Sequence, residues 1–115
     1  MSEGTPSHRM TYGGHLRLDE LLELQDGPEG YSPAPCNDEQ HFVITHQAFE
    51  LWFKMILREL KEVHALLNVE RVEEKSLPIL VHHLDRVTEI FRLLSNQWKV
   101  METLPLKISL RLGTN

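Results

Sequence analysis

Cysteine, long apolar runs and a leader-like N-terminus are scarce or missing in this sequence of 115 residues. Its one cysteine, Cys36, excludes an internal disulfide bond and agrees with a reducing compartment. The longest apolar run, from Leu77 to Val81, falls far short of the ~18 residues that a membrane span needs. The N-terminal residues lack the apolar core of a signal peptide. We therefore expect a soluble, cytoplasmic protein with no membrane partner.

Positive charge is also in short supply. The chain has 12 Lys and Arg against 17 Asp and Glu, a net charge of −5, and the basic residues are scattered along it. Nucleic-acid binders need positive charge clustered on one face, so we expect no nucleic-acid partner. A chain of this length buries only a modest core, which favours a homo-oligomer.

The distribution of glycine, proline and apolar residues divides the chain into three parts. Residues 1–36 form a polar N-terminal arm with a short helix, Leu18 to Leu24, followed by a loop. Residues 37–104 form a long helical hairpin, and residues 105–115 form an irregular tail. The predicted fold class is all-α, with the antiparallel hairpin as one part of a larger helical fold.

Apolar residues recur in alternating steps of three and four through both halves of the hairpin. This 3.5-residue repeat is typical of helices that pack lengthwise against each other. The predicted stripe of the first helix consists of Phe42, His46, Phe49, Phe53, Ile56, Leu60, Val63 and Leu67. The predicted stripe of the second helix consists of Leu77, Leu80, Leu84, Val87, Phe91, Leu94, Trp98 and Met101.

His46 occupies a stripe position where the helix expects an apolar side chain. Burial there would lower the pKa of the imidazole and favour its neutral form. Two interpretations remain open. His46 is either a buried side chain satisfied by a neighbouring polar group, or an imidazole at the wall of an apolar pocket that hydrogen-bonds a bound heterocycle.

The histidines do not have the spacing of a metal site. His82 and His83 are adjacent, His41 and His46 are five residues apart, and Cys36 stands alone. No pair has the i, i+4 spacing of a zinc-binding helix, so we expect no metal ligand in this chain. We expect exposed imidazoles at His64, His82 and His83.

Two blocks of sequence resemble the haem-dependent tryptophan 2,3-dioxygenases. The first is Thr11-Tyr-Gly-Gly-His-Leu-Arg-Leu18, similar to Y-G-x-Y-L-x-L. The second combines Asp38-Glu39 with Phe42-Val-Ile-Thr-His-Gln-Ala-Phe-Glu-Leu-Trp-Phe-Lys54, similar to D-E-x-x-F-I-I-x-H-Q-x-x-E-L-W-x-K. The second block is long and specific. The resemblance continues through Gln97-Trp98 to Leu104.

This resemblance implies an all-helical, homotetrameric oxidoreductase with haem as its cofactor. Such enzymes insert both atoms of O2 across the indole C2–C3 bond of L-tryptophan and form N-formylkynurenine, the first step of tryptophan catabolism by the kynurenine pathway. The haem carries the oxygen chemistry, and the protein orients the substrate.

The resemblance also implies roles for individual residues. His46 is the matching distal histidine, the catalytic candidate, which contacts the indole nitrogen. Trp98 lies in the haem vicinity, and Tyr12 reaches the active site of a neighbouring subunit. The implied substrate-binding segment consists of Phe42, Val43, Ile44, Thr45 and His46.

The chain departs from the family pattern after Leu104. The family continues T-P-x-x-[YF]-x-x-F-R-D-x-L-G, whereas this chain lacks the F-R-D triplet. Arg111 is the stand-in for the arginine that binds the substrate carboxylate, two places late. The family's axial haem histidine lies beyond Asn115. We therefore expect an N-terminal piece of the enzyme that is inactive alone. The alternative is a non-catalytic helical oligomerisation or interaction module.

Overall fold

The computed structural model describes residues 11–26 and 34–104. Over these ranges the secondary structure consists of helices and turns without a strand, which confirms the predicted all-α class. No helix in the described part of the chain is long and apolar enough to cross a membrane. The predicted tail, residues 105–115, and Arg111 within it lie outside the described residues.

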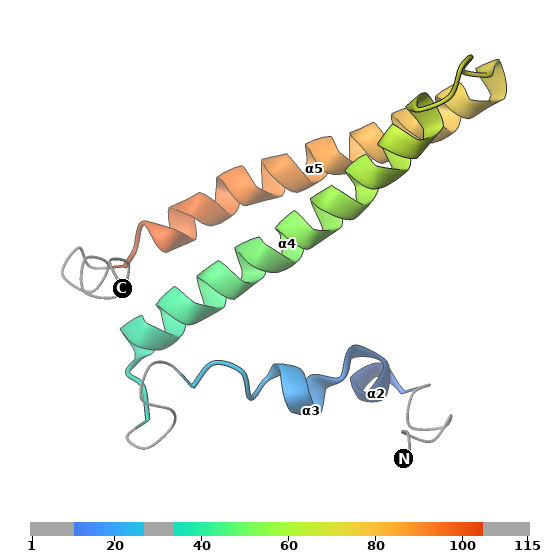
Figure 1. Cartoon of the computed structure of the whole chain (residues 1–115). Helices are drawn as coiled ribbons and strands as arrows, with labels where there is room; N and C mark the ends of the chain where they lie inside the picture. Colours follow the sequence, from blue (N-terminus) through green and yellow to red (C-terminus); the bar gives the residue numbers. More distant parts are fainter. Residues whose placement is uncertain (1–10, 27–33, 105–115) are drawn as a thin grey trace. The chain divides into compact units, whose positions relative to one another are not determined.

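The first of two compact units, Met1–Gln40, contains two short helices, α2 (Tyr12–Leu16) and α3 (Leu18–Leu21) (Figure 1). A side-chain cap starts α2, because the Thr11 hydroxyl accepts a hydrogen bond from the Gly14 amide at 2.9 Å. The predicted short helix thus exists as α3, but it is shorter than the pattern suggested.

Arg17 separates α2 from α3. Its backbone lies in the left-handed region, with φ 54° and ψ 47°, so it ends one helix and begins the next in a new direction. Its guanidinium donates two hydrogen bonds of 2.7 Å to the Glu20 carboxylate. This local ion pair is exposed, so it holds the turn only weakly.

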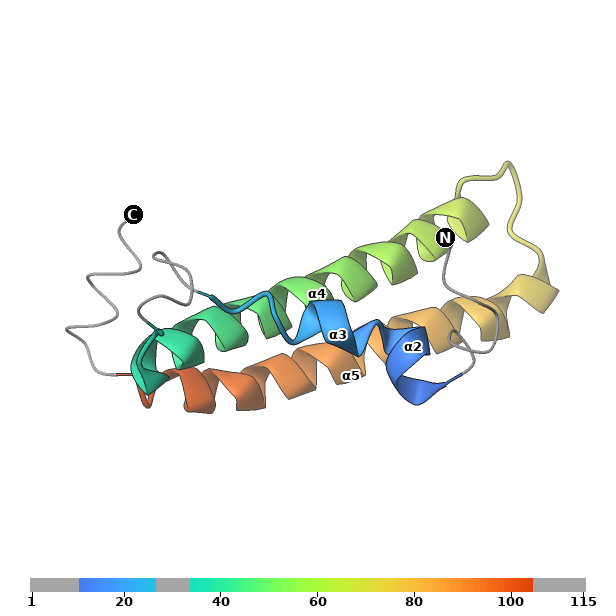
Figure 2. The same cartoon turned by 90° about the horizontal axis from the view of Figure 1, so that it is seen from below.

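The second unit, His41–Asn115, contains most of a long helical hairpin. Helix α4 (Asn37–Leu67) and helix α5 (Leu77–Met101) lie side by side and antiparallel, as Figures 1 and 2 show. The turn between them includes a short 3-10 helix, η1 (Glu74–Ser76). The predicted helical hairpin is confirmed.

Local signals in the sequence set the ends of both helices. Asp38 and Glu39 lie in the first turn of α4, where carboxylates interact favourably with the helix dipole. Pro78 lies in the first turn of α5, where no backbone N–H is needed. Helix α5 ends at Met101, and the Glu102 amide donates to the Trp98 carbonyl at 3.0 Å.

The hairpin core is a single row of apolar contacts between α4 and α5. Its members are 5–9% exposed: Phe49, Ile56, Val87, Ile90 and Leu94. Trp52, Met55 and Met101 pack against this row and are partly buried. In the described part of the chain no large side chain is less than 2% exposed. This is expected when each helix has a neighbouring helix on one side only.

In each predicted stripe, every second residue is exposed, although burial was predicted for it. Phe49, Ile56 and Val63 are buried as predicted, but the stripe positions between them are 40–50% exposed in Phe53, Leu60 and Leu67. The second helix repeats this pattern. We call the exposed set the apolar flank; it consists of Phe53, Leu60 and Leu67 of α4 and Leu77, Leu84, Phe91 and Trp98 of α5.

Contacts between aromatic rings indicate that the apolar flank lies on one side of the hairpin. The buried Phe49 ring contacts the Phe53 ring, with centroids 6.1 Å apart, and the Trp98 ring, with centroids 5.9 Å apart. Residues of both helices therefore flank the same core ring. Because the exposed positions recur every seven residues on each helix, the flank continues along the hairpin.

Candidate functional site

The segment from Phe42 to His46 occupies the second and third turns of α4. His46 is exposed, so the prediction of a buried imidazole is wrong for this hairpin. The reason is its position on the α4 surface. His46 precedes Phe53 by seven residues and shares the side of the apolar flank rather than the side that meets α5.

A backbone hydrogen bond fixes the orientation and tautomer of His46. Its Nδ1 lies 2.8 Å from the Phe42 carbonyl oxygen. Because a carbonyl oxygen only accepts, Nδ1 carries the proton, and in the neutral ring Nε2 presents a lone pair. The Phe42 ring lies alongside, with centroids 4.2 Å apart and planes tilted by 31°. The pair is an apolar surface that ends in one hydrogen-bond acceptor.

The other residues of the segment face different surroundings. The Thr45 hydroxyl donates to the carbonyls of His41 and Phe42, at 2.8 and 3.1 Å, and so stays within its own helix. Val43 is half-buried and Ile44 is 49% exposed. A pocket of about 190 Å³ is lined by Ile44, Thr45, Ala48, Phe49, Gln97 and Val100.

Tyr12 and Trp98 belong to different units of the chain. Tyr12 begins α2 in the first unit and is 76% exposed. Trp98 is 54% exposed, and its ring meets the edge of the Phe49 ring at an angle of 73°. Within the second unit the structure thus brings the Phe42 and His46 rings together.

His41 fastens the start of α4 to the end of α5, a role that the sequence did not reveal. Its Nε2 lies 2.9 Å from the Val100 carbonyl oxygen and 3.0 Å from the Thr103 hydroxyl. The Thr103 hydroxyl itself donates to the Val100 carbonyl at 2.7 Å. These bonds hold the turn before His46 against the second helix. No pattern along one helix could have indicated these bonds, because the partners of His41 lie 59 and 62 positions away.

A buried carboxylate was also missed. Glu59 is 3% exposed and accepts hydrogen bonds from Nδ1 of His83 and, at 2.9 Å, from the Arg86 guanidinium. These bonds, first from Arg86 and then from His83, hold the pKa of Glu59 below its ordinary value. The prediction that His83 is an exposed imidazole is wrong, because it turns inward to Glu59. His64 and His82 are exposed as predicted.

Comparison with known proteins identifies the relatives of this hairpin. The sequence profile of the tryptophan 2,3-dioxygenases matches residues 2–108. The chain belongs to the tryptophan 2,3-dioxygenase family. The match includes both blocks on which the resemblance depended and both helices of the hairpin.

Individual tryptophan 2,3-dioxygenases match at similar levels. The chain is 37% identical over 93 residues to the enzyme of Dictyostelium discoideum. This alignment covers 81% of the chain and 23% of the relative. It is 39% identical over 95 residues to the enzyme of Aedes aegypti, and this alignment covers 24% of that relative. It is also 39% identical over 93 residues to the enzyme of Alteromonas mediterranea, and this alignment covers 26% of that relative. The matches cover 83% and 81% of the chain. The chain spans about a quarter of the length of the curated relatives it matches.

The tryptophan 2,3-dioxygenase family uses haem, and no histidine lines either of two pockets in the described part of the chain. None of the seven histidines in the chain lines the pocket near Gln97. None lines a second hollow either, which is formed on α4 by Glu50, Phe53, Lys54, Leu57, Arg58 and Lys61. In the described ranges no group of three or more His, Cys, Asp or Glu side chains could hold a metal ion. We therefore assign no residue here as an iron ligand.

Proposed function

We propose that this chain supplies the substrate-contacting segment of a tryptophan 2,3-dioxygenase, an oxidoreductase that converts L-tryptophan and O2 to N-formylkynurenine. The observation that supports this proposal is the pairing of Phe42 with His46. An apolar ring beside a single oriented acceptor suits an indole, which offers a flat apolar surface and one N–H donor.

The role of His46 follows from its tautomer. With Nδ1–H donated to Phe42, the Nε2 lone pair accepts the indole N–H and orients the ring. The Phe42 ring covers part of the indole face and excludes water. Haem, when bound, supplies the oxygen chemistry of the family. The part of His46 is therefore to bind the indole, orient it and hold its N–H proton.

The remaining predicted roles stay within this proposal. Val43, Ile44 and Thr45 complete the substrate segment, Trp98 lies near the haem, and Tyr12 comes from a neighbouring subunit. Arg111, outside the described residues, is the candidate for the substrate carboxylate. The proposed enzyme is a homo-oligomer located in the cytoplasm. The single cysteine of the chain is compatible with that compartment.

A chimera tests the proposal. Residues 11–104 replace the matching segment of the Alteromonas mediterranea tryptophan 2,3-dioxygenase, and the purified protein is assayed for a haem Soret band and for N-formylkynurenine. We expect both. A folded chimera that binds haem but forms no product would overturn the substrate-contact role of this segment, provided that the parent enzyme prepared in parallel is active.

The 115-residue chain by itself gives a complementary result. We expect it neither to retain haem through gel filtration nor to oxidise tryptophan above the rate of free haem, because the family resemblance implies that the axial haem histidine is not among these residues. Turnover well above free haem would contradict this expectation.

The second candidate function is a non-catalytic helical module that binds another helix. The exposed apolar flank favours it, because a contiguous apolar surface of this kind marks an interface. The chimera discriminates between the two candidates, since a module that has lost the substrate contacts would not restore product formation.

A further inference from the structure

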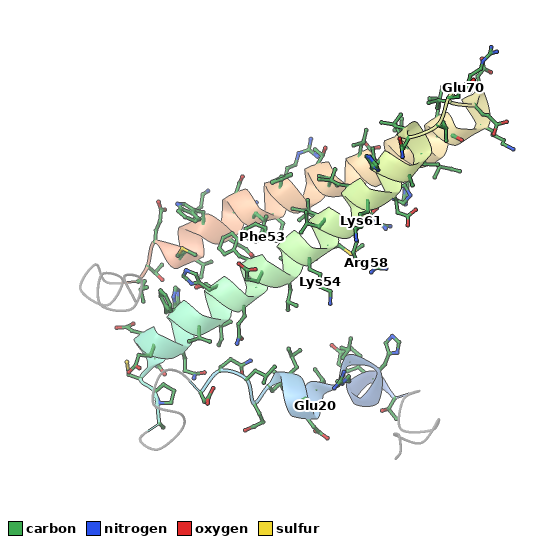
Figure 3. All side chains as sticks on the ribbon, in the orientation of Figure 1. Glu20, Phe53, Lys54, Arg58, Lys61 and Glu70 are labelled. Atoms are coloured by element: carbon green, nitrogen blue, oxygen red, sulfur yellow. The ribbon has the colours of Figure 1, made fainter. Side chains whose placement is uncertain are left out.

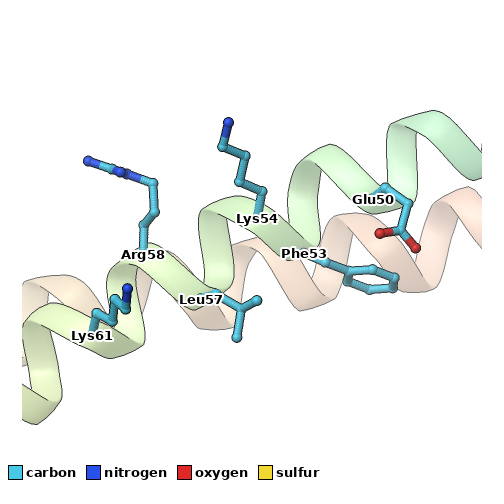
Figure 4. Close-up of a pocket in the computed structure, with 6 residues that line it drawn as sticks. All are labelled: Glu50, Phe53, Lys54, Leu57, Arg58 and Lys61. Atoms are coloured by element: carbon cyan, nitrogen blue, oxygen red, sulfur yellow. The ribbon is translucent and has the colours of Figure 1, made fainter.

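The outer side of α4 concentrates positive charge in an otherwise acidic chain. A hollow of about 430 Å³ is lined by Glu50, Phe53, Lys54, Leu57, Arg58 and Lys61, all from this helix (Figure 4). Figure 3 shows the three cations along one stretch of α4. The net charge of the chain is −5, so this cluster is a local exception to the scattered charges that the sequence indicated.

The three cations have no carboxylate partner in the described part of the chain. Other arginines do find one. Arg17 pairs with Glu20, Arg86 with Glu59 and Arg92 with Glu89. Lys54, Arg58 and Lys61 form no ion pair, although Glu50 lies at the rim of the same hollow. Lys54 and Arg58 are four residues apart, a spacing at which like charges destabilise a helix.

Exposed apolar side chains alternate with these cations. Phe53 is 41% exposed and Leu57 is 63% exposed. In Figure 4, Lys54 and Arg58 extend from α4 in the same direction, while Phe53 and Leu57 follow one another along the helix beside them. Aromatic and arginine side chains, here Phe53 and Arg58, are enriched at protein interfaces.

We propose that the basic face of α4 binds an acidic amphipathic helix of a partner protein. This basic face consists of Phe53, Lys54, Leu57, Arg58 and Lys61. The proposal does not depend on the substrate segment, because no residue of the basic face belongs to it; the basic face shares only Phe53 with the apolar flank.

Charge and spacing select this kind of partner. Lys54 and Lys61 are seven residues apart, about 10.5 Å along the helix axis at 1.5 Å per residue. A partner helix with carboxylates at i, i+4 and i+7 spans the same length on one face. Its intervening apolar residues then meet Leu57 and Phe53, and a carboxylate can accept two hydrogen bonds from the planar guanidinium of Arg58.

The same features disfavour a polyanion. Three cations neutralise few phosphates, and Glu50 together with the net charge of −5 repels an extended anionic surface. Two exposed apolar side chains have no counterpart on a phosphate backbone. An acidic helix uses both the charged and the apolar parts of the basic face.

The test is binding of a fluorescent 18-residue helical peptide with glutamates at i, i+4 and i+7 and leucines between them. Titration with the full chain at near-physiological salt should give saturable binding, weakened by high salt. The double variant Lys54→Glu/Arg58→Glu should bind at least tenfold more weakly. The matched control is Arg71→Glu/Lys99→Glu, which changes net charge equally at exposed positions outside the basic face and should bind within twofold of the unmodified chain.

Two further measurements separate this proposal from general electrostatics. A peptide with lysines in place of the glutamates should bind the Lys54→Glu/Arg58→Glu variant and not the unmodified chain. Leu57→Ser should lower the affinity of the chain for the acidic peptide severalfold, while the helix content of the chain, measured by circular dichroism, stays unchanged. Equal losses in the two double variants, or equally tight binding to a short RNA or to vesicles containing phosphatidylserine, would overturn the proposal.

Discussion

Glu59 brings a carboxylate into the contact between α4 and α5, where only 3% of its surface is exposed. An isolated charge there would be strongly unfavourable, but two donors from α5 satisfy it. Each donor lies on the second helix, so the pairing is correct only in one alignment of the hairpin. Glu59, His83 and Arg86 thus specify the register between the two helices.

The lowered pKa of Glu59 predicts a pH dependence of stability. Below the ordinary value of 4.5 the unfolded chain takes up the proton before the folded chain does, so the contribution of Glu59 to stability is lost as pH falls. Glu59→Gln should lower Tm at about pH 7, and the difference in Tm should shrink toward about pH 3. Thermal unfolding followed by circular dichroism measures both. A difference that stays constant over this range would show that the charge of Glu59 does not contribute.

His46 gives a prediction for the chimera that contains this segment. Removal of one neutral hydrogen bond, in His46→Ala, should reduce kcat/KM for tryptophan roughly three- to tenfold and leave the Soret band intact. Loss of a general base would instead reduce it by ~10²–10⁴. Steady-state kinetics at several tryptophan concentrations distinguish the two sizes of effect.

A tryptophan methylated at the indole nitrogen provides the control for His46. This substrate has no N–H to donate, so His46→Ala should reduce its turnover less than that of tryptophan itself. If both substrates lose the same factor and Tm falls, His46 acts through the stability of the fold and not through substrate contact.

At the scale of the helices, periodicity predicted the elements correctly but not the side that faces inward. Both stripes included the buried positions of Ile56 and Leu94 together with the neighbouring exposed row. The alternative inward row contains Glu59, His83 and Gln97, which are polar, so the apolar pattern favoured the wrong row. Glu59 and His83 satisfy each other across the hairpin, and spacing along one helix carries no information about such partners.

Substitutions at adjacent residues of α4 test this register. Ile56 is 6% exposed and Leu57 is 63% exposed. Ile56→Ala should destabilise the hairpin by ~2–5 kcal/mol, because it removes buried methyl groups and leaves a cavity. Leu57→Ala should change the stability by no more than about 0.5 kcal/mol. Urea unfolding compares the two, and similar losses would contradict the observed register.

The candidate site was predicted unevenly for a related reason. The sequence block around His46 was specific enough to reveal the family, but the local geometry depends on bonds that a pattern does not encode. The Nδ1 contact with Phe42 fixes the tautomer, and His41 fastens the helix start to Val100. Both depend on side-chain orientation, and the second also depends on a residue 59 positions away.

At the scale of the hairpin, the apolar flank is a surface that α4 and α5 cannot cover for each other. Its side chains are 39–54% exposed, and they recur every seven residues on both helices. Exposed apolar rows with this repeat match the packing surface of another helix with the same period. About three quarters of the length of the matched relatives lies outside the part that this chain matches.

For the 115-residue chain by itself, the available partner is a second copy, and we predict self-association through the apolar flank. Two flanks placed against each other would form a four-helix arrangement that removes Phe91 and Leu60 from water. Sedimentation velocity at several concentrations should show species larger than the monomer. Leu60→Glu/Phe91→Glu should shift the population to monomer, because both side chains are at least 40% exposed and their loss leaves the hairpin core intact. The control Thr88→Glu, at an exposed position of α5 outside the flank, should associate like the unmodified chain. A monomer at every concentration would contradict the prediction and leave the apolar flank without a role in assembly of this chain.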